Sequence, residues 1–111
     1  MSDQLFDDLN AAIRESRKKV DLADALERLT ANRDFKEVVL VGYLRDYAVK
    51  LVLEKAEADN QSPEKQISII KKLDSIGEFN QFLQSIFLHA DIARKVSGQA
   101  SDELESLLAR G

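Results

Sequence analysis

The stretch DNQSPE at residues 59–64 decides the fold, because it holds the signals that a sharp reversal between two helices needs. Its first half supplies loop-forming residues. Ser62 is suited to cap a helix, Pro63 to occupy its first position and Glu64 to stabilise its positive end. The sequence therefore predicts a reversal at residues 60–62 and a helix that begins at Pro63.

Downstream of this turn, apolar residues recur at helical spacing as far as Val96. They are Ile67, Ile69, Ile70, Leu73, Ile76, Phe79, Phe82, Leu83, Ile86, Phe87, Ala90, Ala93 and Val96. About 34 residues in one helix would span roughly 50 Å. We expect Gly98 to end or bend this helix, and residues 101–110 to form a short terminal helix.

Upstream of the turn, the sequence predicts a helix from Phe35 to about Ala58. Asp34 is the expected N-cap, with Glu37 in the capping-box position three residues later. The run at residues 38–44, VVLVGYL, is locally β-like, so a buried strand is the alternative there.

The N-terminal region carries two further helical patterns, at about residues 3–19 and from Asp21 to about Asn32. The second has Leu22, Ala25, Leu26 and Leu29 as its apolar stripe. The two patterns are compatible with one bent helix or with two short helices.

These patterns together predict an all-α fold, a long antiparallel helical hairpin with additional N-terminal helices and a short C-terminal helix. The chain of 111 residues fits a single domain, residues 1–111. Within it we expect N-terminal helices at 1–32, the hairpin at 34–97 and a C-terminal helix or tail at 98–111.

Two glycines occupy matching positions in the expected hairpin, Gly42 lying 18 residues before Asn60 and Gly77 lying 17 after it. Glycine inside a helix costs about 1 kcal/mol relative to alanine. The matching depth therefore predicts that the two helices approach closely at these glycines. Unrelated glycines that face solvent are the alternative.

The composition narrows the classes of function. Charged residues make up 32% of the chain and the formal net charge is −4, which argues against generic binding to nucleic acid or anionic membranes. The absence of cysteine excludes disulfides, thiolate zinc sites and a cysteine nucleophile. No apolar run approaches the ~18 residues of a membrane span, and the acidic N-terminus lacks a secretory signal pattern. We expect a cytoplasmic protein.

No catalytic, cofactor or metal motif emerges. The single histidine, His89, has Asp91 only two residues away, so the two side chains would not meet on a helix. The position three residues before His89 is Ile86, which does not fit the Glu-x-x-His pattern of helical di-metal sites. We therefore expect no enzyme activity, cofactor, metal or small-molecule substrate.

A basic cluster closes the first helical pattern, formed by Arg14, Arg17, Lys18 and Lys19. Positive charge is all that a phosphate contact requires, so these residues are candidates for contacting nucleic acid. The alternative is a helix C-terminus whose basic residues offset the helix dipole.

The apolar residues of the last long helix are more informative, because between Ile69 and Phe87 they cover more than half of its circumference. One neighbouring helix cannot cover that width. The N-terminal helices could complete a small three- or four-helix bundle. Otherwise a partner chain, such as a second copy, covers the far half of the helix around Phe79, Phe82, Ile86 and Phe87.

Three stretches, NRDFKEVVL at 32–40, Gly42-Tyr43 and ADIARK at 90–95, resemble a group of short phage-encoded proteins. The resemblance covers about residues 24–107. These proteins belong to the virion structure and morphogenesis region of tailed-phage genomes. The resemblance implies a context and not a mechanism, since the shared residues are core and cap positions.

The expected function is that of a non-enzymatic helical assembly protein, either a phage virion component or a morphogenesis factor for the head, neck or tail. It would act in the host cytoplasm and in the virion, as a homo-oligomer or bound to other virion proteins. Two alternatives remain, a packaging accessory that uses the basic cluster on nucleic acid and a small inhibitor or adaptor of a host protein.

Overall fold

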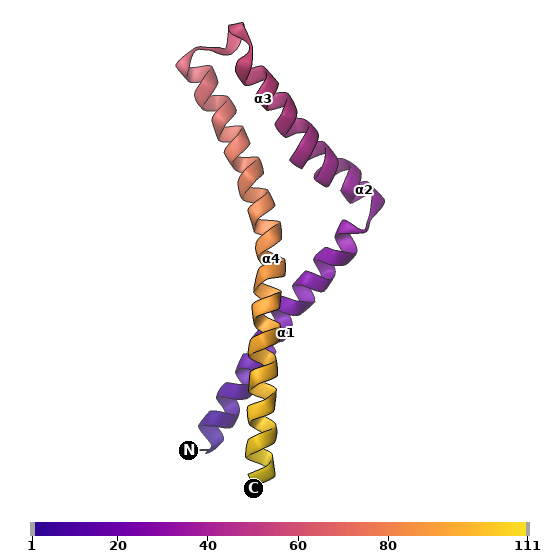
Figure 1. The fold of residues 1–111 in the computed structure, drawn as a ribbon, viewed down its shortest axis with the longest axis vertical. Helices are drawn as coiled ribbons and strands as arrows, with labels where there is room; N and C mark the ends of the chain where they lie inside the picture. Colours follow the sequence, from indigo (N-terminus) through magenta and orange to yellow (C-terminus); the bar gives the residue numbers. More distant parts are fainter. Residues whose placement is uncertain (1, 111) are drawn as a thin grey trace. The chain divides into compact units, whose positions relative to one another are not determined.

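The computed structural model describes residues 2–110, and these contain helices and turns but no strand. In chain order the helical elements are α1 (Ser2–Thr30), α2 (Arg33–Phe35), η1 (Lys36–Tyr47), α3 (Ala48–Ala56), η2 (Ala58–Asn60) and α4 (Pro63–Arg110), as drawn in Figure 1. The all-α prediction is confirmed, and the strand alternative at residues 38–44 is wrong.

Contacts divide the chain into two units that share the long helix α4. The terminal unit consists of Met1–Leu26 and Ser85–Gly111, and the hairpin unit of Glu27–Gln84.

The turn of the hairpin unit forms where the sequence predicts it. Helix α4 begins at Pro63, and the backbone N–H of Lys65 donates to the Ser62 hydroxyl at 3.3 Å. Side-chain amides satisfy the carbonyls at the end of α3, because Asn60 Nδ2 donates to Glu54 O at 2.8 Å and Gln66 Nε2 donates to Lys55 O at 2.9 Å. Hydrogen bonds at the end of α3 and at the start of α4 thus stabilise the reversal.

The core of the hairpin unit is a single layer between α3 with η1 and the first half of α4. Leu51, Ile69 and Ile76 are buried at its centre. Farther from the turn, the rings of Tyr43 and Phe79 meet edge to face with centroids 5.8 Å apart. The two arms therefore run antiparallel, as predicted.

The winding of η1 differs from the expected α-helix, because Lys36–Tyr47 forms a π-helix with i→i+5 bonding. The β-like run of the sequence lies inside this element. Branched side chains crowd the neighbouring turn of an α-helix, which lowers their preference for that winding. The feature that favoured a strand in the sequence thus coincides with altered helical winding.

The N-cap of this arm is Asn32, and the expectation of Asp34 as the cap is wrong. The Asn32 side chain accepts a hydrogen bond from the Phe35 backbone N–H at 2.9 Å, and its backbone is extended. Asn and Asp cap helices about equally well, so the helix starts at the earlier of the two. Glu37 instead pairs with Arg33 at 3.4 Å.

The glycines do not mark a close approach of helices. A methyl group at Gly77 would meet nothing within 4 Å, and Gly77 is exposed. A methyl group at Gly42 would lie 2.9 Å from the carbonyl oxygen of Glu37 in its own helix. Gly42 therefore belongs to the π-helical winding, and the matching depth of the two glycines was misleading.

The terminal unit pairs α1 with the C-terminal half of α4, which lie side by side in Figure 1. The two helices run antiparallel, because Asp24 lies near Arg94 while Ser16 lies near Ser101. The residues buried in this unit are Leu9, Ser16, Ala23, Leu26, Ile86, Ala90, Ala93 and Ala100. Helix α1 is continuous, which selects one helix over two short helices.

Helix α4 continues through Gly98 to Arg110, so the expected break and the separate C-terminal helix are wrong. Burial along its C-terminal half keeps an alternating spacing of four and three residues, as in a two-helix coiled coil. The positions are Ile86, Ala90, Ala93, Ser97, Ala100, Leu104 and Leu107. This seam packs on α1 and crosses Gly98 without interruption, which explains why one glycine does not end the helix.

Candidate protein-binding face

In the terminal unit, an ion pair between Arg94 of α4 and Asp24 of α1, at 3.9 Å, marks one side of the helix pair. Asp24 follows buried Ala23, and Arg94 follows buried Ala93. Successive residues of an α-helix lie about 100° apart. Residues one position before Ala23 and Ala93 therefore lie on the opposite side of the helix pair from this ion pair.

Those preceding residues are Leu22 and Ile92, and both are exposed. Leu88 and Val96 lie one turn either side of Ile92, so they share its side of α4. We call Leu22, Leu88, Ile92 and Val96 the apolar face. Their exposed fractions are 54%, 58%, 52% and 41%, respectively. The face therefore spans both helices of the terminal unit and is not covered by that unit.

Charged residues border the apolar face on both helices. On α1, Lys18 pairs with Glu15 at 3.0 Å, and its hydrogen bond lowers the pKa of the Glu15 carboxyl. Lys19 adds a positive charge near this pair. On α4, exposed Lys95 lies three residues after Ile92, and Glu103 lies two turns after Val96 on the same side. The border therefore carries charges of both signs on each helix.

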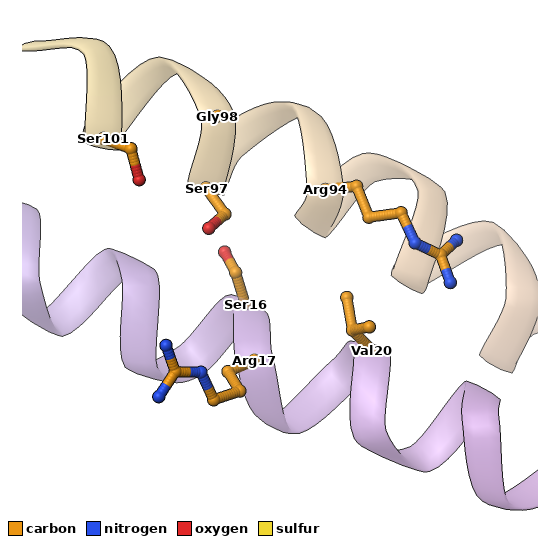
Figure 2. A pocket seen from close by; sticks show the side chains of 7 residues that line it. All are labelled: Ser16, Arg17, Val20, Arg94, Ser97, Gly98 and Ser101. Atoms are coloured by element: carbon orange, nitrogen blue, oxygen red, sulfur yellow. The ribbon is translucent and has the colours of Figure 1, made fainter.

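The other side of the helix pair contains a pocket of about 400 Å³ (Figure 2). It is lined by Ser16, Arg17, Val20, Arg94, Ser97, Gly98 and Ser101. The Ser16 and Ser97 hydroxyls point toward one another across the helix pair, whereas the Arg17 and Arg94 guanidinium groups point in different directions. The pocket exists because small residues meet at the seam.

The charge of Arg94 at this pocket is compensated by two carboxylates. Arg94 pairs with Asp91 at 2.9 Å as well as with Asp24. Because the two guanidinium groups do not converge, they do not form a clamp for a phosphate or carboxylate. We therefore assign the pocket no ligand.

The structure distributes the four partner-binding residues expected from the sequence over different environments. Ile86 is buried in the seam against α1. Phe79 is half-buried and contacts Tyr43. Phe82 and Phe87 are 58% and 39% exposed. Two of the four therefore remain accessible to a partner. Helix α1 packs against the C-terminal half of α4, as in the alternative in which N-terminal helices cover the apolar residues.

The sequence interpretation missed the apolar face itself. It placed Leu22 and Leu29 in the inner stripe of α1, whereas both are exposed and Leu26 is the buried member. It also left Leu88 and Ile92 out of the apolar set. Their spacing of four residues, continued by Val96, was the signal that could have revealed a second stripe.

Three of the four residues of the basic cluster share one side of α1. Arg14, Arg17, Lys18 and Lys19 are all exposed on α1. Arg14, Arg17 and Lys18 are three or four residues apart and point outward, whereas Lys19 lies four residues before buried Ala23 and therefore closer to the seam. The cluster also lies within α1 and not at its C-terminus, because the helix continues to Thr30.

The hairpin unit has an exposed apolar surface of its own on α3. Val49, Val52 and Leu53 are 53–63% exposed, on the side of α3 away from buried Leu51. This surface lies on one helix, whereas the apolar face of the terminal unit spans two helices.

Sites for chemistry are not evident in the part of the chain that the structure describes. His89 is exposed and does not line the pocket. Between residues 2 and 110, no group of three or more His, Asp or Glu side chains could hold a metal ion. No helix within the same range combines the length and apolar character that crossing a membrane requires.

Comparison of the chain with protein-family models, with curated proteins and with solved structures finds no match.

Proposed function

We propose that this chain is a non-enzymatic helical protein that binds another protein chain through the apolar face. The observation that carries this proposal is the position of Leu22 on α1 beside Leu88, Ile92 and Val96 on α4, all exposed on one side of the terminal unit. Apolar side chains that gather in one exposed patch, with charges at the border, are typical of protein interaction sites.

The energetics are adequate for a specific contact. Fully burying a Leu, Ile or Val side chain contributes roughly 1.5–3 kcal/mol, so burying the exposed half of each contributes about 1 kcal/mol. The four residues together contribute about 4 kcal/mol, and a partner with an apolar stripe of its own adds a similar amount. Association costs at least about 4 kcal/mol, so a matching apolar partner favours binding more than a polar one does.

The biological setting that we propose is virion assembly of a tailed phage, with the protein acting in the host cytoplasm and in the virion. Its support is the resemblance of residues 32–40, 42–43 and 90–95 to short phage-encoded proteins. Mass spectrometry of purified virions tests this setting. Absence of the protein from virions and from assembly intermediates would contradict it.

The binding proposal itself is tested by photo-crosslinking in the native host. A photoreactive amino acid is placed at Ile92 on the apolar face or, as a control, at exposed Glu105, which lies four residues after pocket-lining Ser101 and so on the other side of α4. We expect discrete protein adducts from position 92 and few from position 105.

The identity of the crosslinked protein distinguishes the assembly role from the adaptor alternative. Adducts at position 92 with a second copy or a virion protein support an assembly role, and adducts with one host protein support the adaptor alternative. Equal, diffuse labelling from both positions would show that the apolar face is not a binding site.

A further inference from the structure

We propose that η1 is a conformational switch, a segment that interconverts between the π-helix of the structure and an α-helix and so changes which apolar side chains face the rest of the hairpin unit. This inference goes beyond the proposed function, because η1 lies in the hairpin unit and the apolar face lies in the terminal unit. Three observations carry it: the burial of the segment, its sequence and its single glycine.

Burial within η1 has no preferred side. In α4 the buried residues of the hairpin core, Ile69 and Ile76, lie seven residues apart, which is two helical turns. In η1 the six consecutive residues 39–44 are all half-buried, and none of its 12 residues is fully buried. Six residues go more than once around a helix of either winding. Packing therefore does not select one rotational setting of this segment.

The sequence of the segment is apolar all round. The run VVLVGYL at 38–44 has an apolar or aromatic side chain at every position except Gly42. An i→i+5 bond puts more residues in each turn than an i→i+4 bond, so over the ten residues from Val38 to Ala48 the two windings differ by roughly half a turn. Either winding therefore offers apolar side chains to the same neighbours, and conversion turns Val38, now 69% exposed, to the opposite side.

Gly42 makes the π-helix depend on one residue. The i→i+5 pattern makes the Glu37 carbonyl oxygen the acceptor for the Gly42 N–H, and a methyl group at Gly42 would lie 2.9 Å from that oxygen. A side chain at this position therefore disfavours the π-helix. Alanine is the residue most favourable to an α-helix, so the balance between the two windings is sensitive to this single position.

The switch couples the exposed side of η1 to its inner contacts. In the π-helix the Tyr43 ring stacks on Tyr47 with centroids 6.0 Å apart and meets the Phe79 ring edge to face. Conversion turns Tyr43, five residues before Ala48, by about a quarter of a turn and so removes its contact with Phe79. A chain that contacts exposed Val38 therefore stabilises the π-helix, because it has affinity for that winding alone.

NMR of the purified full-length chain tests the switch, since scalar couplings across hydrogen bonds identify the acceptor of each N–H. In the wild-type protein we expect the Gly42 N–H to couple to the Glu37 carbonyl. We also expect relaxation dispersion confined to residues 36–47, because helix rearrangements of this kind exchange in microseconds to milliseconds. A wild-type chain without dispersion in this segment would overturn the switch, whatever the variants do.

Gly42→Ala should move the population to the α-helix. The amide at position 42 should then couple to the Val38 carbonyl, and the dispersion and the nuclear Overhauser effects between the Tyr43 and Phe79 rings should be lost. The matched control is Gly77→Ala in α4, where a methyl group meets nothing within 4 Å. It should keep the wild-type couplings and dispersion in η1. If Gly42→Ala retains the Glu37 acceptor, or loses helical chemical shifts across residues 36–47, the segment has no α-helical state and the inference is wrong.

Discussion

Gly42 and Gly77 lie in different surroundings, so replacing them by alanine should have opposite effects on stability. Gly77 lies exposed inside α4 with open space around it, whereas Gly42 lies in η1 with a carbonyl oxygen where a side chain would begin. The local backbone geometry, and not the neighbouring helix, distinguishes the two positions.

We expect Gly77→Ala to raise the free energy of unfolding by up to about 1 kcal/mol, because alanine is the better helix former and its methyl group meets nothing. Gly42→Ala should lower it, since the methyl group would lie 2.9 Å from the Glu37 backbone oxygen. Urea denaturation of both variants measures the difference. Equal stabilisation by both substitutions would show that η1 tolerates a side chain at this position.

The cap of the hairpin arm gives a second prediction at this scale. Asn32→Ala should cost about 1 kcal/mol, because the Phe35 N–H loses its acceptor. Asn32→Asp should retain most of the stability. Asp34→Ala should cost only about 0.3 kcal/mol, as expected for an exposed acid in the first turn. If Asp34→Ala were the more damaging substitution in thermal unfolding, the helix would start at the later cap.

Helix α3 shows at the scale of the element how two apolar faces differ in their energetic role. Leu51 is 1% exposed and packs against Ile69 and Ile76, whereas Leu53, two residues later, is 63% exposed. Leu51→Ala should therefore cost about 2–5 kcal/mol, including the cavity that it leaves. Leu53→Ala should change stability by less than about 0.5 kcal/mol. Chemical denaturation compares the two, and similar losses would mean that both faces of α3 are covered.

The elements that the sequence predicted well are those whose determinants are local. The turn before Pro63 depends on residues within a few positions of one another, and so do the two arms that it joins. The continuity of α4 through Gly98 depends instead on packing against α1, which lies far away in the sequence. The side on which Leu22 lies depends on the same distant helix.

The π-helical winding of η1 was beyond the sequence argument for a different reason. Apolar spacing predicts a helix, but it does not distinguish i→i+4 from i→i+5 bonding over a short segment. The branched residues around Val39 indicated only that an α-helix is locally unfavourable. The sequence left a strand open as the alternative to an α-helix, and the structure has a π-helix there.

At the scale of the whole molecule, the chain consists of two helix pairs, each with a core one layer thick. A pair of helices buries one stripe of each member, so apolar residues on second stripes stay exposed. This accounts for the apolar face on the terminal unit and for the exposed side of α3. These exposed stripes are the surfaces on which the proposed binding of a further chain depends.

The division into two units predicts that a substitution in the core of one unit leaves hydrogen exchange in the other unit unchanged. In hydrogen exchange, Leu51→Ala should accelerate exchange in α3 and around Ile69 and Ile76, because these residues share one core. Amides near Ala90 and Ala93, which pack in the terminal unit, should keep their wild-type protection. A uniform loss of protection along the chain would instead identify one cooperative folding unit.

The π-helix also has a consequence for how the gene can change. Each ring closed by an i→i+5 bond holds one more residue than the ring of an α-helix, so η1 has residues to spare. Deletion of one codon between Lys36 and Tyr47 can be absorbed by a return to α-helical bonding. The same deletion within α4 would turn every later side chain by about 100° and move the seam away from α1. Length variation in this lineage should therefore concentrate in η1.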